Sequence, residues 1–272
     1  MKRIFNTGET AEQLKQEYNP EGSTLRKAQM RMLDMLLFLD KVCTANNIPY
    51  FLSDGNLLGA VRHGGFIPWD DDMDIVVMQK DCKKLVPLLL QATQDTPYIL
   101  QCHETDHNYK QFWYVLRDTQ SEYIQDSPIH KIRKYRGLQV DIFPYSDNVI
   151  PVFKKISWRV VRLCNRMIQN DHLKIAEYLY KINRYCLIPL FTFIGLFKIK
   201  RDTITYAYTT QWNTQFKKSE IFPLSKITFE GKAIAAPKNP DYVLQTTFGL
   251  NYLDLPAKEN RNAHQTKIVF YQ

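Results

Sequence analysis

A run of four aspartates in five residues constrains this chain most: Asp70, Asp71, Asp72 and Asp74 stand directly before the apolar residues 75–78. Like charges packed this closely repel one another unless a cation lies among them. An apolar run of this length predicts a buried strand, which would hold the carboxylates at a sheet edge. Side chains alternate along a strand, so Asp72 and Asp74 would share one face while Met73 turns to the core. The pattern predicts a site for Mg²⁺ or Mn²⁺, which prefer hard oxygen ligands.

Asp141 is a further acidic candidate, because it stands alone in the apolar segment LQVDIFPY at residues 138–145. A lone acid in such a strand is often a structural residue bonded to backbone amides. Beside the aspartate run, we interpret it as a metal ligand from a neighbouring strand and as a catalytic residue together with Asp72 and Asp74. Asp70 is predicted to bind the metal or to orient a water, with loop capping as an equal alternative.

Three residues before the acidic run are candidates for binding a phosphorylated ligand. Arg62 offers a planar fork of N–H donors to a diphosphate, and His63 lies next to it; their structural alternatives are a surface salt bridge and a helix C-terminal residue. Trp69 would stack on a nucleobase or on a quaternary ammonium group, or else pack the loop.

The segment FLSDGNLLGAVRHGGFIPWDDDMDIVV at residues 51–77, followed by LQVDIFPY, resembles the LicD family of phosphocholine transferases, which includes the fukutin-related transferases. A C-terminal segment, ITFEGKAIAAPKNPDYVLQTTFGLNYLDLP at residues 227–256, is also similar to that family. Residues 150–215 match it only loosely. The sequence FGLNY departs from the YGDY-like sequence that is commoner there, which argues against an acidic role at that point.

The resemblance implies a nucleotidyltransferase-type core that moves a phosphorylated small alcohol from CDP-choline, or a related CDP-alcohol, to a sugar hydroxyl. Gly55 to Gly59 would form the turn and the first helical residues, with Asp72 and Asp74 as the acid pair and Asp141 as their partner. The acceptor would be a cell-surface or lipid-linked glycan, such as lipopolysaccharide or teichoic acid. Glu230 would contact the donor ribose or a cation, or shape a turn, and His264 falls where the family often keeps a histidine.

Two other function classes stay open on the sequence. The same acids would serve a nucleotidyltransferase that makes a nucleotide-sugar or a nucleotidylated alcohol, which would release pyrophosphate instead of cytidine monophosphate. A non-catalytic adaptor that binds membrane or glycan is the third class. The three acids Asp72, Asp74 and Asp141 together argue against the adaptor.

Element patterns predict an α+β fold, a mixed sheet flanked by helices with a basic helical insertion. The expected organisation is a catalytic core at 1–150, a basic helical subdomain at 151–215 and a C-terminal segment at 216–272 that packs on the core. We expect helices at 24–45, at 56–62, from a cap at Asp81 to about 91, and at 241–248, and strands at 48–53, 73–78, 98–102, 111–117 and 138–143. The five cysteines lack metal-ligand spacing and are expected to be buried reduced thiols, typical of a cytoplasmic protein.

Charge is concentrated in one region of the chain. Residues 151–201 hold eleven Lys or Arg against Asp171 and Glu177, a net of +9, whereas the whole chain has a formal net charge of +8. A helix there would place Phe153, Ile156, Val160, Cys164 and Met167 on one face and basic residues on the other. The apolar segment 186–197 would reach only about 18 Å as a helix, too short to span a bilayer.

Two interpretations of residues 151–201 compete. In one, the apolar segment packs inward and the basic residues are simply solvated. In the other, the region meets an anionic membrane surface, which would place the protein peripherally on the inner face of the membrane. Nucleic acid is a poorer partner for this charge, because no DNA- or RNA-binding module accompanies it.

Overall fold

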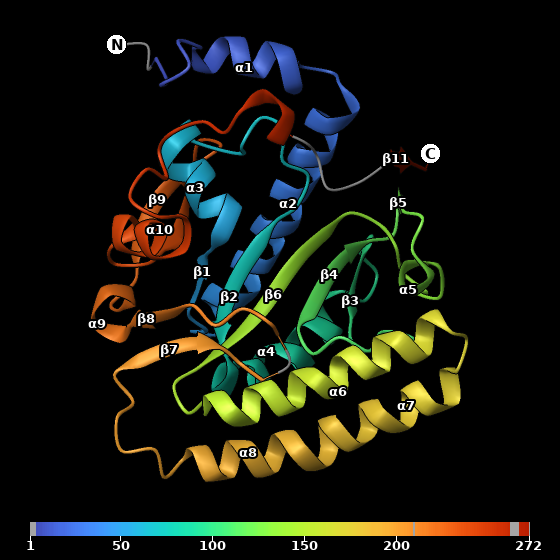
Figure 1. Cartoon of the computed structure of the whole chain (residues 1–272). Coiled ribbons are helices and arrows are strands. Elements are labelled where there is room, and N and C mark those ends of the chain that lie inside the picture. Colours follow the sequence, from blue (N-terminus) through green and yellow to red (C-terminus); the bar gives the residue numbers. More distant parts are fainter. Residues whose placement is uncertain (1–3, 209, 262–266, 272) are drawn as a thin grey trace.

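The computed structural model describes residues 4–208, 210–261 and 267–271. A mixed sheet with the strand order β1-β2-β6-β4-β3 crosses the molecule (Figure 1). These strands are β1 (Tyr50–Leu52), β2 (Asp74–Met78), β6 (Gln139–Ser146), β4 (Tyr114–Asp118) and β3 (Tyr98–Gln101). The far end of β6 also pairs with β7 (Thr203–Tyr206), which pairs with β8 (Gln215–Lys217). The predicted α+β class is confirmed.

The pairing of β2 with β6 is parallel, and the other pairings in this sheet are antiparallel within the described residues. Both strands of the parallel pair are buried along most of their length, as expected for a central pair covered on two sides. The pair places the start of β2 beside the third residue of β6. Two acid-bearing segments far apart in sequence therefore become direct neighbours.

Two helices, α2 (Thr24–Ala45) and α4 (Gln79–Ala92), pack on each other and on the parallel strand pair. Helix α2 begins as predicted, because the Ser23 hydroxyl accepts a hydrogen bond from the Arg26 amide at 3.1 Å. The expected cap at Asp81 is wrong, since α4 begins at Gln79 with Met78 in the cap position and no side-chain cap bond. Asp81 lies in the first turn, where a carboxylate still favours the helix dipole.

Several element boundaries differ from those predicted. Strand β2 begins at Asp74, so residues 70–73 form an irregular segment before it, and the strand alternation predicted for Asp72 and Asp74 does not apply to Asp72. Helix α3 (Asp54–His63) begins two residues earlier than predicted, and β4 starts three residues later. Between β4 and β6 lie β5 (Ser121–Ile124), which pairs with β11 (Lys267–Phe270), and α5 (Pro128–Lys131).

The C-terminal part packs on α3 and β1. It contains α9 (Lys218–Ile221), the hairpin of β9 (Ser225–Phe229) with β10 (Lys232–Ala236), α10 (Pro240–Phe248) and η2 (Lys258–Asn260). Helix α10 confirms the predicted helix, and the Asn239 side chain caps it by accepting from the Tyr242 amide. Its buried residues, Val243 and Leu244, belong to the same core as Met32 of α2 and Leu14 of α1 (Ala11–Tyr18).

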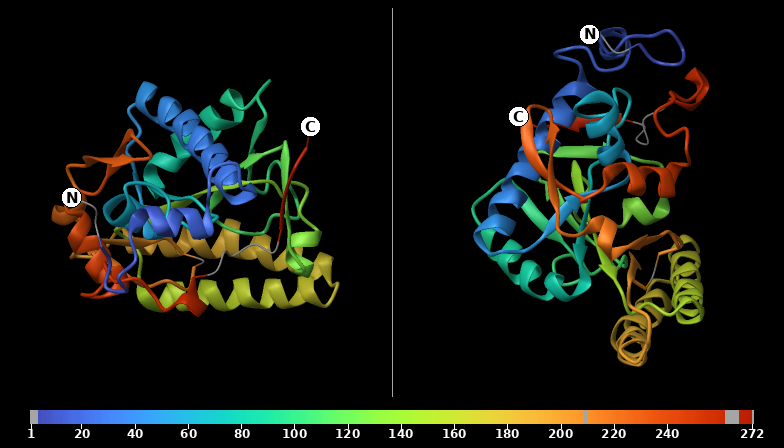
Figure 2. Two further views of the ribbon diagram at one scale, coloured as in Figure 1. Left: turned by 90° about the horizontal axis from the view of Figure 1, so that it is seen from above. Right: turned by 90° about the vertical axis from the view of Figure 1, so that its left-hand side faces the viewer.

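Residues 151–195 form a long helical arm of α6 (Pro151–Gln169), α7 (Leu173–Ile182), η1 (Asn183–Leu187) and α8 (Ile188–Gly195). The arm lies along one edge of the molecule and projects beyond the sheet (Figures 1 and 2). The buried face of α6 holds Lys154, Ser157, Val161, Cys164 and Ile168, which is rotated from the predicted face. Polar partners explain the rotation, because Lys154 donates to two backbone carbonyls and Ser157 donates to Asn183.

Four cysteines are buried free thiols, as predicted, whereas Cys186 of η1 is exposed. The prediction was wrong for Cys186 because η1 lies on the outer side of the arm. Within the described part of the chain, no helix combines the length and the apolar character that crossing a membrane demands.

Candidate active site

The centre of the candidate site is the pair Asp74 and Asp141. Asp74 is the first residue of β2 and lies directly opposite Asp141 of β6 in the parallel register. Neighbouring strands are about 4.8 Å apart, so the two carboxylates leave adjacent points of the sheet. The backbone amide of Asp141 donates to the Met73 carbonyl at 2.7 Å, which holds the register at this level.

The N-terminal end of α3 adds another carboxylate. Asp54, its first residue, has φ +45°, a left-handed conformation that non-glycine residues rarely adopt. Its carboxylate accepts a hydrogen bond from the Tyr206 hydroxyl at 2.7 Å. Burial raises the pKa of Asp54 above its ordinary value. A strained, buried acid at the start of a helix points to a functional position more than to a structural one.

Two residues of α3 connect the helix to the aspartate run. The Asn56 side-chain oxygen accepts from the Asp74 amide at 2.5 Å, and its amide nitrogen donates to the Asp72 carbonyl at 3.2 Å. A Cβ atom on Gly55 would lie 2.8 Å from an Asp70 carboxylate oxygen, so a side chain there would collide with it. The predicted turn at Gly55 therefore brings the helix backbone against Asp70.

Residues 70–72 are a fixed segment and not a solvated loop. The Asp71 side chain is 0% exposed, and its backbone carbonyl accepts from the Tyr123 hydroxyl. Gln29 of α2 donates to the Asp70 carbonyl at 2.9 Å. These bonds hold the acidic residues in place although their charges repel.

Mutual repulsion dominates the electrostatics of this cluster. Burial raises the pKa of Asp74 well above its ordinary range, and the charges of Asp72, Asp141, Asp54 and Asp70 add to the effect. Burial and the charge of Asp72 also raise the pKa of Asp70, whose carboxyl shares a hydrogen bond with Asp72. Burial raises the pKa of Asp141 to about 6, against the lowering effect of Arg117 and of a Trp113 hydrogen bond. Such a desolvated group of acids favours a bound cation.

Asp141 is oriented by a second layer of residues. The Trp113 indole N–H donates to one carboxylate oxygen at 2.7 Å, and the Gln139 amide donates to the other at 2.6 Å. Arg117 donates in turn to the Gln139 side-chain oxygen at 2.6 Å. Arg117 is fully buried behind the site, so it acts as a support and not as a surface residue that grips phosphate. The Trp113 ring packs against Phe143 and Trp212, and Tyr206 packs against Phe143.

The donor set has the chemistry of a magnesium site, since all of its members are hard carboxylate oxygens. Among the described residues, however, no three acidic, histidine or cysteine side chains already converge as a metal-binding group. The Asp141 oxygens point to Trp113 and Gln139 in this arrangement. The backbone nevertheless brings Asp74 and Asp141 to directly opposite positions in the parallel register.

The sequence model described as "LicD/FKTN/FKRP, nucleotidyltransferase domain" matches residues 47–159, a range that contains all of these acids. Residues 47–159 are therefore similar to a LicD family domain. A 72-residue segment is 39% identical to the lipopolysaccharide cholinephosphotransferase LicD of Haemophilus influenzae and covers 26% of this chain and 27% of that protein. A 47-residue segment is 45% identical to the human ribitol 5-phosphate transferase FKRP and covers 16% of this chain and 10% of that protein.

A third relative, an uncharacterized protein of Rickettsia prowazekii, is 27% identical over 140 residues, which are 45% of this chain and 53% of that protein. The chain thus matches between 10% and 53% of the length of these three relatives. Tyr206 and the helical arm beyond residue 159 lie outside the LicD domain match.

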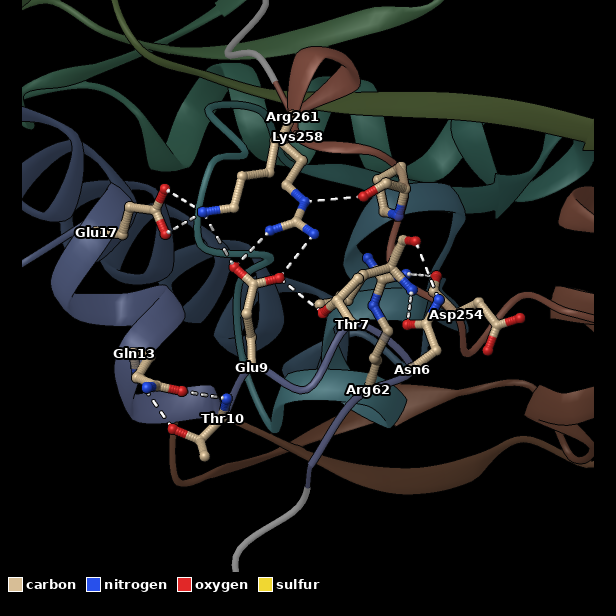
Figure 3. Close-up of polar contacts among 12 residues, drawn as sticks. Asn6, Thr7, Glu9, Thr10, Gln13, Glu17, Arg62, Asp254, Lys258 and Arg261 are labelled. Carbon is tan, nitrogen blue, oxygen red and sulfur yellow. Dashed lines mark hydrogen bonds and ion pairs between the residues drawn. The ribbon is translucent and has the colours of Figure 1, made fainter.

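Arg62, His63 and Trp69 lie within the LicD domain match but not at its carboxylates. Arg62 donates to the backbone carbonyls of Tyr252 and Asp254 at 3.4 and 3.0 Å, and its Nε donates to His63 (Figure 3). It lies eight residues along α3 from Asp54, about 12 Å of helix rise. Trp69 packs against Tyr18 and His63, with the Arg261 guanidinium over its ring. In the structure, the contacts of these residues therefore pack α3 and the following loop against the N- and C-terminal segments.

Gly59 and Glu230 also hold the C-terminal part in place. A Cβ atom on Gly59 would lie 2.4 Å from the Gly65 carbonyl oxygen, so the helix and the following loop touch through backbone. Glu230 pairs with Arg26 at 2.9 Å and accepts from the Phe66 amide at 3.1 Å. Its predicted turn role fits this position better than a ribose contact. His264 lies outside the described residues.

Sequence reasoning missed four residues that shape the site: Asp54, Asn56, Trp113 and Tyr206. Asp54 and Asn56 flank Gly55 in the segment SDGN, where an acid and an amide at a helix start resemble ordinary caps. Trp113 and Tyr206 come from distant strands, and no local pattern indicates that they reach an aspartate.

Proposed function

We propose that this chain transfers phosphocholine, or a similar phosphorylated alcohol, from a CDP-linked donor to a hydroxyl of a glycan, with Mg²⁺ or Mn²⁺ as cofactor. The observation that carries the proposal is the juxtaposition of Asp74 and Asp141 in neighbouring parallel strands. The charges of Asp54, Asp70 and Asp72 also raise the pKa of Asp74. The printed names of two relatives, a cholinephosphotransferase and a ribitol 5-phosphate transferase, support the reaction class.

In the proposed reaction, the acceptor oxygen forms a bond to the phosphorus that carries the alcohol. The bond from that phosphorus to the bridging oxygen of the diphosphate breaks, and cytidine monophosphate leaves. The acceptor proton passes to the Asp141 carboxylate, which burial makes more basic than an ordinary aspartate. Trp113 and Gln139 hold that carboxylate in one orientation.

Asp72 and Asp74, with Asp70 and Asp141 completing the set, would hold the metal. The ion would neutralise the diphosphate charge that otherwise repels an incoming oxygen. Asn56 keeps Asp72 and Asp74 in place through their backbone groups, and Gln29 does the same for Asp70. The chain thus contributes a set of aspartates whose backbone groups are fixed by hydrogen bonds. These bonds hold the aspartates together although their charges repel one another.

Incubating the protein with a panel of CDP-alcohols and Mg²⁺, then identifying the released nucleotide by mass, tests the proposal. Metal-dependent release of cytidine monophosphate, suppressed by a chelator, is the expected result. Release of pyrophosphate from a nucleoside triphosphate would support nucleotidyl transfer instead. Absence of any metal-dependent donor cleavage would leave the adaptor interpretation, and full turnover in both Asp72→Asn and Asp74→Asn would refute the roles given to these acids.

A lipid-linked acceptor would be met at a membrane, so we further propose a cytoplasmic protein that works on the inner membrane face. Supplying the acceptor sugar free and attached to a lipid carrier in vesicles would test this part separately. Faster transfer to the carrier-bound form is expected, and equal rates would argue against it.

A further inference from the structure

The outer side of the arm exposes large apolar side chains along its whole length. The outer face consists of Ile175, Tyr178, Tyr185, Leu190, Phe193 and Phe197, each at least one third exposed, with Phe193 at 59% and Phe197 at 73%. Helices α7, η1 and α8 follow one another without a break, so these residues belong to one nearly continuous helical rod. Successive residues of this face are three, four or seven positions apart in sequence, except Tyr185 and Leu190, which are five apart. The wider turns of the π-helix η1 explain this exception.

The fold does not use this face. In the right-hand view of Figure 2 the arm projects at the lower end of the molecule, with the α7–α8 rod at its edge. The inner side of α8 borders a cavity of about 480 Å³, lined by Ile188, Thr192, Phe193 and Leu196 together with residues of α4, β4 and β6, so that Phe193 lies where the cavity meets the outer face. Helix α8 thus remains loosely packed on its inner side and unpacked on its outer side. Monomers rarely leave so long an apolar stripe exposed without a binding role.

The charges around the outer face are almost all positive. Residues 151–201 carry a net of +9, and Lys174, Lys181, Lys198 and Lys200 accompany the rod itself. Glu177, the one acid within the rod, is engaged by Lys110 at 2.5 Å and by Lys181 and His103. Its charge is thereby compensated within the protein. The face therefore combines an apolar stripe, aromatic side chains and the lysines Lys174, Lys198 and Lys200, whereas Lys181 is paired with Glu177 at 3.2 Å.

From this combination we infer that the outer face docks on the surface of an anionic lipid bilayer, with the rod lying in the plane of the interface. Apolar and aromatic side chains enter the headgroup boundary, while lysines meet lipid phosphates. From Ile175 to Phe197 the rod is about 33 Å long, which suits an interfacial helix. Charge complementarity favours lipid over a second copy of this chain, because two faces that both carry an excess of lysines would repel each other. The inference does not depend on the proposed reaction.

Vesicle co-sedimentation of the full chain tests this inference without any activity measurement. Vesicles of phosphatidylcholine alone are compared with vesicles that also contain phosphatidylglycerol, at low and high salt. Binding to the anionic vesicles at low salt, and a fall of about tenfold or more at 1 M salt, is the expected result. No binding to anionic vesicles at low salt would overturn the inference.

A double variant, Phe193→Ser with Phe197→Ser, is expected to lower binding about tenfold, because two phenyl groups no longer enter the interface. Leu250→Ser is the matched control, since Leu250 is 83% exposed in the turn after α10, away from the arm. Lys174→Gln with Lys200→Gln should weaken binding at low salt, whereas Lys226→Gln on β9 should not. Circular dichroism checks that each variant folds.

The same variants separate lipid from other occupants of the face. If sedimentation equilibrium shows a dimer that the double phenylalanine variant dissociates, and vesicles do not bind, a second copy of the chain covers the face. Equal vesicle binding by the double variant and Leu250→Ser would show that the apolar stripe is not the docking surface. Equal binding to neutral and anionic vesicles would contradict the proposed contact between the lysines and anionic lipid.

Discussion

The carboxylate site and the helical arm depart from ordinary burial in opposite directions. Around Asp74, buried acids crowd together, although charged groups normally stay in water or beside an opposite charge. On the arm, Phe193 and Phe197 stay in water, although large apolar side chains normally enter the core. The first arrangement costs folding free energy, and the second forgoes the gain of burial. We propose a different ligand for each region: a compact cation for the first and a broad anionic lipid surface for the second.

The largest expected effect breaks the carboxylate cluster. Asp74→Asn should reduce turnover about a thousandfold or more, because the residue loses the charge that would hold the metal. It should also raise the melting temperature. The raised pKa of Asp74 means that the folded state keeps its proton longer than the unfolded state, so stability falls as pH rises from the ordinary carboxyl range through the folded pKa.

Donor cleavage assays and thermal melts at neutral pH measure both effects of Asp74→Asn. The exposed Asp202→Asn serves as the control and should change neither quantity. Adding Mg²⁺ should raise the melting temperature of the wild-type protein and not that of Asp74→Asn. Full activity of the Asp74→Asn protein would contradict the functional interpretation of the buried acids, because catalysis would then not require the Asp74 charge.

The second effect concerns Lys154, the buried cation that fastens the arm to the sheet side. Its ammonium donates to the Tyr206 and Trp212 carbonyls at 2.8 and 2.5 Å, and burial lowers its pKa to about 8. The unfolded state therefore binds more protons between pH 8 and the ordinary lysine value. Relative to Lys154→Met, the wild-type protein should gain up to about 3 kcal/mol of stability as pH rises through that window. Urea unfolding at several pH values measures the gain, and a flat difference would contradict it.

Glu230 gives the third effect and separates support from catalysis. Burial opposes its charge, but the hydrogen bond and charge of Arg26 outweigh it and lower the pKa of Glu230. Glu230→Gln should cost about 1–2 kcal/mol of stability at neutral pH. That contribution should vanish as pH falls through the folded pKa of Glu230, and the KM for the CDP-alcohol should not change. A higher KM at unchanged stability would restore a donor-binding role for Glu230.

The smallest effect refines the description of Asp141. Trp113→Phe keeps the aromatic ring beside Phe143 but removes the indole donor to the carboxylate. A hydrogen bond to the ionised form lowers a pKa, so its loss should raise the pKa of Asp141 above about 6. The acid limb of the kcat/KM profile should then shift to higher pH, with about a tenfold loss near pH 6. An unshifted limb would mean that Asp141 is not the group that titrates.

The sequence determined the local chemistry of this protein. Apolar strands with embedded acids and a capped α2 are local patterns of spacing and charge, and they predicted their structures closely; the basic segment predicted its helix but not the face that helix buries. The local pattern did not indicate what Arg62 contacts in the folded protein. Its type and spacing suit a phosphate, but its partners, the carbonyls of Tyr252 and Asp254, lie about 190 residues away.

Only the tertiary structure decided which local features meet. The parallel register of β2 and β6 places Asp74 beside Asp141, and distant strands bring Tyr206 to Asp54 and Trp113 to Asp141. The tertiary structure also decided which face of the arm stays outside, because buried bonds of Lys154 and Ser157 turn α6 away from its predicted orientation. Periodicity follows from neighbouring residues alone, whereas register and docking depend on partners far along the chain, and only folding brings these into contact.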